Sequence, residues 1–228
     1  IHLYSRYIIK LEADEMKENL TEIVFILDRS GSMAGLESDT IGGFNGLLEK
    51  QKQNEGRAIV TTVLFDEKYE LLHDRIDIKG IKPIDENDYY VRGCTALLDA
   101  VGRTISKIDN VQKNTLKLER AENVLFVIVT DGFENASKEY TYSAVKKLIE
   151  GKKKKGWEFM FLGANIDAAE EASKIGIEKA RAATYRADSK GIRTNYQVMH
   201  RDICEYRDFG AINSSLQQEI DKADEDNR

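Results

Sequence analysis

Short hydrophobic runs alternate along this chain with longer segments in which apolar residues recur every three or four positions. The runs at 23–27, 124–130 and 157–163 have the length of buried strands. The periodic segments have the spacing of amphipathic helices, with apolar positions Ile41, Phe44, Leu47 and Leu48; Leu98, Val101, Ile105 and Ile108; Val145, Leu148 and Ile149; Ile166, Ala169, Ala172 and Ile175; and Ile192, Tyr196, Met199, Ile203 and Tyr206. This alternation predicts an α/β fold: a doubly wound, mostly parallel central sheet with helices on both faces.

One pair of segments predicts an exception to parallel pairing. Residues 59–65 and 69–72 are both apolar enough to form strands, and three polar residues separate them. That separation is the length of a hairpin connection, so we expect one antiparallel strand at the edge of the sheet. Residues 180–186 are a weaker strand candidate.

The two ends of the chain differ from its middle. Residues 1–19 form an N-terminal extension with neither the apolar core nor the cleavage site of a secretory signal. Met16 reads as a natural start, so we expect residues 1–15 to be upstream or non-native; the alternative is an extra strand or helix on the sheet. Residues 20–207 form the expected folded domain. Residues 208–228 read as a polar C-terminal tail, with too few apolar residues after 217 to pack.

The first hydrophobic run ends in a carboxylate and two hydroxyl side chains, Asp28, Ser30 and Ser32. Alternate residues share a side, and Gly31 permits a tight loop, so these three side chains can converge. The run at 124–130 is likewise followed by Asp131. Parallel strands deliver their carboxyl ends to one edge of a sheet, where open α/β folds bind ligands, so we expect the two carboxylates to meet there.

Three ordered motifs resemble the von Willebrand factor A (vWA) domain. They are D-x-S-x-S at 28–32, the isolated Thr95 that opens a predicted helix, and T-D-G at 130–132; the match covers roughly residues 20–207. The resemblance implies the metal-ion-dependent adhesion site (MIDAS) of that family. By this resemblance the metal ligands are Asp28, Ser30, Ser32, Thr95 and Asp131.

The donor types in this set favour a particular ion and a particular use. Oxygen donors without an adjacent His or Cys select hard cations, so we expect Mg²⁺, with Mn²⁺ as a substitute. Three of the five donors are neutral, and the family arrangement holds one or both carboxylates behind water, which leaves much of the metal charge uncompensated. A Glu or Asp of a partner protein can then complete the shell. We therefore expect a protein-binding adaptor module rather than an enzyme.

Other chemistry fits the sequence less well. A phosphatase of the haloacid dehalogenase type would use Asp28 as nucleophile, but it needs a second carboxylate two positions on, where this chain has Ser30. Serine hydrolysis lacks the G-x-S-x-G elbow and a histidine base, and Gly151-Lys152 lacks the rest of a phosphate-binding loop. A structural vWA module, in which the metal only stabilises the loops, stays open as an alternative.

Charge and apolar content limit the classes of binding partner that the sequence predicts. The net charge of −6 argues against a general nucleic-acid binder, and no run approaches the about 18 apolar residues that suggest a membrane span. The segments 25–33 and 42–45 resemble intracellular bacterial vWA proteins. That resemblance implies a cytoplasmic adaptor in a multiprotein assembly, such as one with an AAA+ ATPase or a stress-response complex.

Four further features carry expectations of their own. We expect Cys94 to be a small buried residue, with a redox-sensitive thiol as the alternative. Residues 152–155, four lysines, predict a solvated helix end. Glu134 is expected either at the rim of the site or as a loop carboxylate. Asp99, one turn after Thr95, either supports the site loop or complements the helix dipole.

Overall fold

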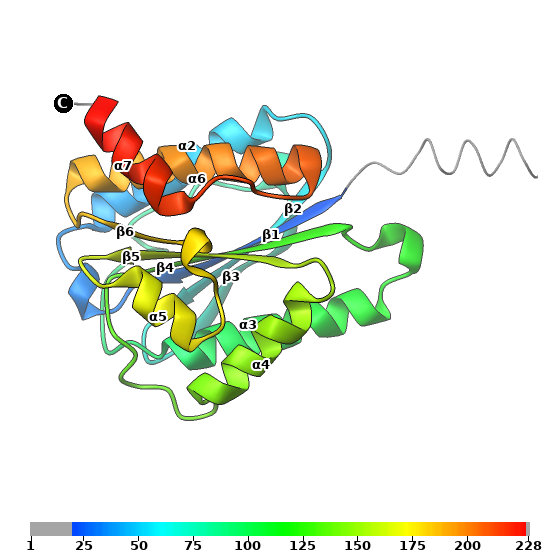
Figure 1. Ribbon diagram of the computed structural model, residues 1–228, viewed down its shortest axis with the longest axis horizontal. Coiled ribbons are helices and arrows are strands. Elements are labelled where there is room, and N and C mark those ends of the chain that lie inside the picture. The colour runs from blue at the N-terminus through cyan, green and yellow to red at the C-terminus, as the bar shows by residue number, and fades with distance from the viewer. Residues whose placement is uncertain (1–19, 227–228) are drawn as a thin grey trace, which may run out of the picture.

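The computed structural model describes residues 20–226, and its strands and helices alternate as the hydrophobic pattern predicts (Figure 1). The expectations for residues 1–19 lie outside the described residues. In chain order the strands and α-helices are β1 (Thr21–Asp28), α2 (Glu37–Lys52), β2 (Ala58–Phe65), β3 (Tyr69–Asp77), α3 (Leu97–Asn114), β4 (Asn123–Thr130), α4 (Tyr142–Lys153), β5 (Glu158–Ala164), α5 (Ala168–Lys174), β6 (Ala182–Tyr185), α6 (Ser189–Phe209) and α7 (Leu216–Asp226).

The strands form a six-stranded sheet in the order β3-β2-β1-β4-β5-β6. Only the β2–β3 pair is antiparallel, so the expected mostly parallel sheet with one antiparallel edge strand is confirmed. Strands β1 and β4 lie side by side at its centre, with Leu27 paired to Val129. Their carboxyl ends therefore open at the same place on the sheet edge, as the strand-end carboxylates require.

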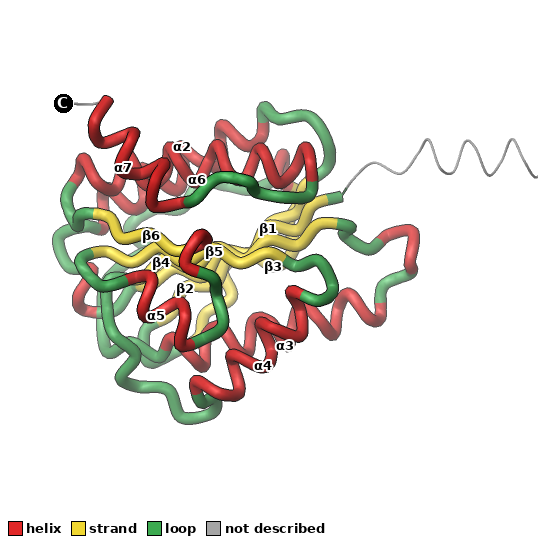
Figure 2. The backbone as a smooth tube through the Cα atoms, in the orientation of Figure 1, coloured by secondary structure: helices red, strands yellow, loops and turns green. Residues whose placement is uncertain are grey.

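Helices cover both faces of the sheet (Figure 2). Helices α2, α6 and α7 lie on one face and α3, α4 and α5 on the other, and each layer encloses its own hydrophobic core. In the first core, Phe25 packs edge to face against Phe44, with the ring centroids 5.1 Å apart. In the second core, Phe126 stacks on Phe159, with the ring centroids 5.0 Å apart. Within β1, Phe25 belongs to the first core, and its neighbours Val24 and Ile26 belong to the second, as the two-residue period of a strand dictates.

The expectation of an unpacked polar tail is wrong for the part of it that forms α7. Leu216 and Ile220, one helical turn apart, are only 1% and 2% exposed. Gln217 also pairs with the free edge of β6, accepting from the backbone N–H of Thr184 at 2.8 Å. A short helix can be anchored by two correctly spaced apolar residues and one edge contact, whereas the sequence expectation rested on the number of apolar residues alone.

The lysine run at the end of α4 also differs from expectation at its first member. Lys152 is buried, forms an ion pair with Asp109, and lies 5.3 Å from the centre of the Trp157 ring. Lys154 and Lys155 are exposed, in agreement with a solvated helix end. The aliphatic stem of a lysine lets it lie along apolar surface while its ammonium group finds a carboxylate.

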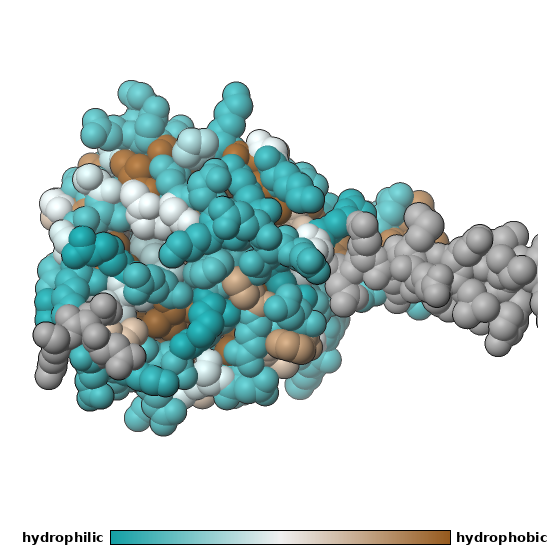
Figure 3. Space-filling model, turned by 90° about the horizontal axis from the view of Figure 1, so that it is seen from above, coloured by the Kyte–Doolittle hydropathy of each residue, from teal (hydrophilic) through white to brown (hydrophobic). Residues whose placement is uncertain are grey.

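Seen from above, the layer of α2, α6 and α7 presents mainly hydrophilic residues, with single hydrophobic ones between them (Figure 3). Scattered apolar residues of this kind are normal on protein surfaces. Within residues 20–226, none of the helices combines the length and the apolar character that crossing a membrane demands.

Candidate metal site

The loop that follows β1 turns sharply and is fixed on both sides. Asp28 is 1% exposed, and the next turn is a short 3₁₀ helix, Gly31–Met33, anchored by the buried side chain of Met33. Ser30 directs its backbone N–H back to Asp28 Oδ1 at 2.7 Å. The hydroxyl of Tyr89 donates to the Asp28 carbonyl at 2.5 Å. The loop is thus held by contacts that leave the serine hydroxyls facing the sheet edge.

The hydroxyl groups expected from the sequence form one continuous chain with a carboxylate. Thr95 Oγ1 lies 3.0 Å from Ser30 Oγ, which lies 3.0 Å from Ser32 Oγ. Ser32 Oγ in turn donates to Asp131 Oδ1 at 2.5 Å. Three segments far apart in sequence therefore bring four of the five expected ligands together, and Asp28 joins them through the N–H of Ser30.

Gly132 completes this arrangement because no side chain fits at its position. A Cβ atom there would lie 2.8 Å from Thr95 Oγ1 and 3.1 Å from Ser32 Oγ. The glycine of T-D-G thus allows the loop after β4 to approach the hydroxyl groups. A side chain would have to push apart the oxygens that the other two motifs supply.

Burial sets the electrostatics of the two carboxylates. Desolvation raises the pKa of Asp28 from 3.8 to about 6, although hydrogen bonds from Thr130 and Ser30 oppose the rise, and the nearby charge of Asp131 adds to it. Desolvation also raises the pKa of Asp131, against the hydrogen bond from Ser32. Two carboxylates whose ionised forms are disfavoured would gain from a bound cation.

The donor set fits a small hard cation. In an octahedral shell with metal–oxygen distances of about 2.1 Å, neighbouring oxygens lie about 3 Å apart. The separations of Ser30 Oγ from Ser32 Oγ and from Thr95 Oγ1 are both 3.0 Å. In residues 20–226 no three His, Cys, Asp or Glu side chains gather in a way that could hold a metal. An ion at this edge would therefore be held by hydroxyl groups together with the two carboxylates.

Glu134 and Asp99 brace the loop beside the site. Glu134 accepts from the backbone N–H of Leu98 at 2.8 Å, so it caps the start of α3 and is a loop carboxylate rather than a rim residue. Asp99 accepts from the N–H groups of residues 138–140. Partial burial acts to raise its pKa, but these three bonds and the charge of Arg103 hold it below its ordinary value. Asp99 therefore supports the loop that follows Asp131.

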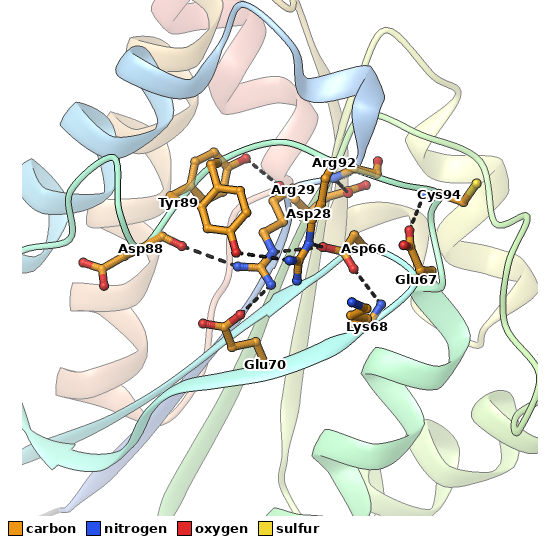
Figure 4. Close-up of polar contacts among 12 residues, drawn as sticks. Asp28, Arg29, Asp66, Glu67, Lys68, Glu70, Asp88, Tyr89, Arg92 and Cys94 are labelled. Atoms are coloured by element: carbon orange, nitrogen blue, oxygen red, sulfur yellow. Dashed lines mark hydrogen bonds and ion pairs between the residues drawn. The ribbon is translucent and has the colours of Figure 1, made fainter.

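Sequence reasoning missed a buried ionic cluster next to the site (Figure 4). Arg29, inside the D-x-S-x-S motif, is 0% exposed; its Nε lies 3.1 Å from Asp66 Oδ2 and its Nη2 lies 2.6 Å from Glu70 Oε2. Arg92 Nε lies 2.6 Å from the same Asp66 oxygen. An arginine at the end of a buried strand needs an acidic partner, so the sequence signals a buried carboxylate near Arg29 without singling out Asp66.

Cys94 does not have the expected buried position. Its side chain is exposed, and its backbone N–H donates at the surface to Oε2 of Glu67, at 2.9 Å. Glu67 and the neighbouring Gly93 are exposed as well. The expectation of a buried cysteine is wrong because this part of the loop lies at the surface, and the chain becomes buried only from Thr95 onward.

Comparison with known proteins rests on structure alone. The sequence matches none of the models of known protein families and none of the curated proteins. The structure is similar to that of proximal thread matrix protein 1 (PTMP1) from the mussel byssus, with a TM-score of 0.56 and 12% identity over 82% of this chain and 47% of that one. A second PTMP1 structure, described as having a zinc-occupied MIDAS motif, matches at 14% identity and a TM-score of 0.56 over 82% of this chain and 46% of that one.

A structure described as von Willebrand factor type A, from Catenulispora acidiphila, matches with a TM-score of 0.55 and 13% identity over 81% of this chain and 42% of that one. The chain thus spans less than half the length of these structures. At such identities the likeness shows the fold alone.

Proposed function

Because this chain has the vWA fold, we propose that it is a protein-binding module whose recognition of a partner depends on a divalent cation. The observation that carries the proposal is the chain of oxygens from Thr95 through Ser30 and Ser32 to Asp131, with neighbouring atoms 2.5 to 3.0 Å apart. This row of oxygen atoms lies at the carboxyl edge of the parallel strands, where open α/β folds bind their ligands.

The ion that this site suits best is Mg²⁺, with Mn²⁺ as a substitute. The oxygen donors are of the hard type that both ions prefer. Ser30, Ser32, Thr95, Asp28 and Asp131 would hold the ion, directly or through water. The zinc-occupied MIDAS described for PTMP1 supports a divalent ion at such a site, although it is a different metal in a different protein.

The partner group that we propose is a Glu or Asp side chain. Neutral hydroxyl donors leave the ion electrophilic, so an anionic oxygen from outside would complete its shell. The resemblance of the motif segments to intracellular bacterial proteins extends the proposal to a cytoplasmic adaptor, in an assembly such as one with an AAA+ ATPase or a stress-response complex.

We propose that the module is not an enzyme. Asp28, the nucleophile of the phosphatase alternative, is 1% exposed, and its two oxygens accept from Ser30 N and Thr130 Oγ1. A carboxylate held in this way is poorly placed to attack a phosphorus atom. Turnover of a generic phosphate ester in Mg²⁺ that disappears in Asp28→Asn would contradict this proposal.

Metal binding is tested by thermal unfolding with and without Mn²⁺ or Mg²⁺. Binding to the folded state alone should raise the thermal midpoint of the parent protein. Ser32→Ala should lose this response, and Ser173→Ala, an exposed serine on α5, should keep it. An unchanged midpoint in the parent at millimolar metal would overturn the assignment.

Partner recognition is tested by titration calorimetry once a partner has been isolated in Mg²⁺ buffer. Replacing the partner's acidic residue by its amide should weaken binding by much more than the loss of a surface ion pair, about 0 to 1 kcal/mol. Chelation should release the partner as well. Equal affinity in Mg²⁺ and in EDTA would favour the structural alternative, in which the metal only stabilises the loops.

A further inference from the structure

Asp66 and Arg29 form a fully buried ion pair directly behind the candidate metal site. Both side chains are 0% exposed, and Nε of the arginine lies 3.1 Å from Oδ2 of the aspartate. Asp66 comes from the turn between β2 and β3, whereas Arg29 lies between the expected ligands Asp28 and Ser30. The pair thus ties the hairpin turn to the loop that carries the two serines.

The same carboxylate also reaches the segment that carries the third hydroxyl. Asp66 Oδ2 accepts from Arg92 Nε at 2.6 Å, three residues before Thr95. The Asp66 carbonyl accepts from the N–H of Ala96 at 3.0 Å, one residue after it. Asp66 therefore holds the Thr95 segment on both sides of the hydroxyl group.

The two ligand-bearing segments are joined to each other as well. The N–H of Arg92 donates to the carbonyl of Arg29 at 2.9 Å, and the N–H of Gly31 donates to the carbonyl of Gly93 at 3.1 Å. A shift of either arginine would therefore move the backbone next to Ser30 and Thr95. The distance between those two hydroxyl groups depends on how the guanidinium groups are held.

The other anion at Arg29 cannot replace Asp66. In the described structure the Glu70 carboxylate forms an ion pair with Arg29, but its side chain is 44% exposed. The carbonyl of Asp88, at 3.4 Å, is a weak neutral acceptor. Asp66 is the fully buried carboxylate that faces both guanidinium groups in the described structure. Removing one partner of a buried ion pair leaves an uncompensated buried charge, which is strongly destabilising, so we expect the arginines to shift if Asp66 is removed.

We propose that Asp66 is a positioning residue for the metal site: it sets the distance between the Ser30 and Thr95 hydroxyl groups through Arg29 and Arg92, without contacting the ion. Metal affinity is then controlled from a turn that contributes no ligand. This inference rests on the proposed function, because it presupposes that these hydroxyl groups bind a divalent cation.

The test is the Mn²⁺ dissociation constant of Asp66→Asn, measured by electron paramagnetic resonance at a temperature where circular dichroism shows a folded protein. Residues that orient metal ligands typically contribute 10- to 100-fold in affinity, so we expect binding weaker by roughly 10-fold or more. A residue that only stabilises the fold would change the unfolding midpoint and leave this constant unchanged.

Glu22→Gln is the matched control. Glu22 is 0% exposed, lies at the opposite end of β1, and accepts from Arg75 Nε at 2.9 Å and Gln112 Nε2 at 2.7 Å. The control thus removes a buried charge from the same strand but far along it from the metal site. Glu22→Gln should lose stability but keep its Mn²⁺ affinity within about twofold of the parent. If destabilisation alone weakened metal binding, Glu22→Gln would lose Mn²⁺ affinity as Asp66→Asn does.

A milder pair of variants decides the matter if Asp66→Asn does not fold. Arg92, with a side chain 33% exposed, is changed to Gln, and Arg75, 22% exposed, is changed to Gln as its control. Weaker Mn²⁺ binding in Arg92→Gln alone supports the proposal. Parent-like affinity in Arg92→Gln, or an equal loss in Arg75→Gln, overturns it. If the parent itself does not bind Mn²⁺, the proposed function fails first and the positioning role falls with it.

Discussion

Thr130 donates a hydrogen bond from Oγ1 to Asp28 Oδ2 at 2.5 Å, across the carboxyl ends of the two central strands. Both side chains are buried, at 0% and 1% exposure. The threonine of T-D-G therefore holds the aspartate of D-x-S-x-S, while the aspartate of T-D-G holds Ser32. Two hydrogen bonds therefore link the motifs, and each motif holds an expected metal ligand of the other.

Thr130→Val should weaken both the fold and the metal site. A hydrogen bond to a charged group is worth about 1.5 to 3 kcal/mol, so we expect a loss of that size in the free energy of unfolding, measured with urea at pH 7. Mn²⁺ affinity should fall as well, because the bond keeps Asp28 ionised and oriented. The control is Thr104→Val, which removes a buried hydroxyl donating to Ala100 O at 2.6 Å on α3. Equal Mn²⁺ affinity in the two variants would contradict the assigned role.

The raised pKa of Asp28 predicts an unusual pH dependence in metal-free buffer. Burial lifts this pKa from 3.8 to about 6, so between these values the folded state binds more protons than the unfolded state. Stability contributed by this group is therefore present at low pH and is lost as pH rises toward 6, by roughly 3 kcal/mol in total. Asp28→Asn removes this penalty.

We accordingly expect metal-free Asp28→Asn to be more stable than the parent at pH 7, with the advantage shrinking toward pH 4. Urea unfolding at several pH values measures the difference in unfolding free energy between variant and parent. The titration of the other acidic groups is common to both proteins and cancels in this difference. Saturating Mg²⁺ should reverse the order at pH 7, since the parent alone keeps the full ligand set. A variant that is less stable than the parent by a constant amount at every pH would show that Asp28 does not carry the raised pKa.

The layout of the sheet could be predicted because its signals are local. Apolar runs such as 124–130, which are short and rich in β-branched residues, favour strands buried on both faces, and the three-residue spacer at 66–68 predicts a hairpin. The helix α7 was missed because its packing depends on partners far away in sequence. Nothing in residues 216–226 alone reveals that Leu216 meets the core or that Gln217 pairs with the edge of β6.

The candidate ligands could be named from motif order, whereas the groups that hold them could not. Ser30, Thr95 and Asp131 follow strands or open helices, so their convergence follows from parallel pairing. Asp66 lies in a turn that reads as ordinary polar hairpin sequence, and its role depends on two arginines 37 and 26 residues away. Contacts of this kind are set by loop geometry, for which a single sequence has no periodic signal.

Gly93→Ala should disturb the site through two separate effects. The residue has a φ of +66°, and a Cβ atom would lie 1.5 Å from Glu67 Oε2, the acceptor for the N–H of Cys94. Gly56→Ala is the control, since Gly56 has a φ of +77° with nothing within 4 Å of a Cβ atom. The backbone penalty of about 1 to 2 kcal/mol should appear in both variants. Only Gly93→Ala should lose further stability in urea and bind Mn²⁺ more weakly; equal behaviour would mean that Glu67 can move without consequence.

The packing of α7 gives a prediction that is independent of any metal. Leu216 is 1% exposed in the core shared with α6 and the sheet, so Leu216→Ala should create a cavity and cost about 2 to 5 kcal/mol of unfolding free energy. Leu118, 79% exposed in the connection after α3, supplies the same chemical change on the surface. Leu118→Ala should stay within about 0.5 kcal/mol of the parent. Urea unfolding at neutral pH measures both. Equal midpoints for the two variants would mean that the segment after residue 215 does not pack in solution, and the polar tail expected from its composition would then describe it better than α7.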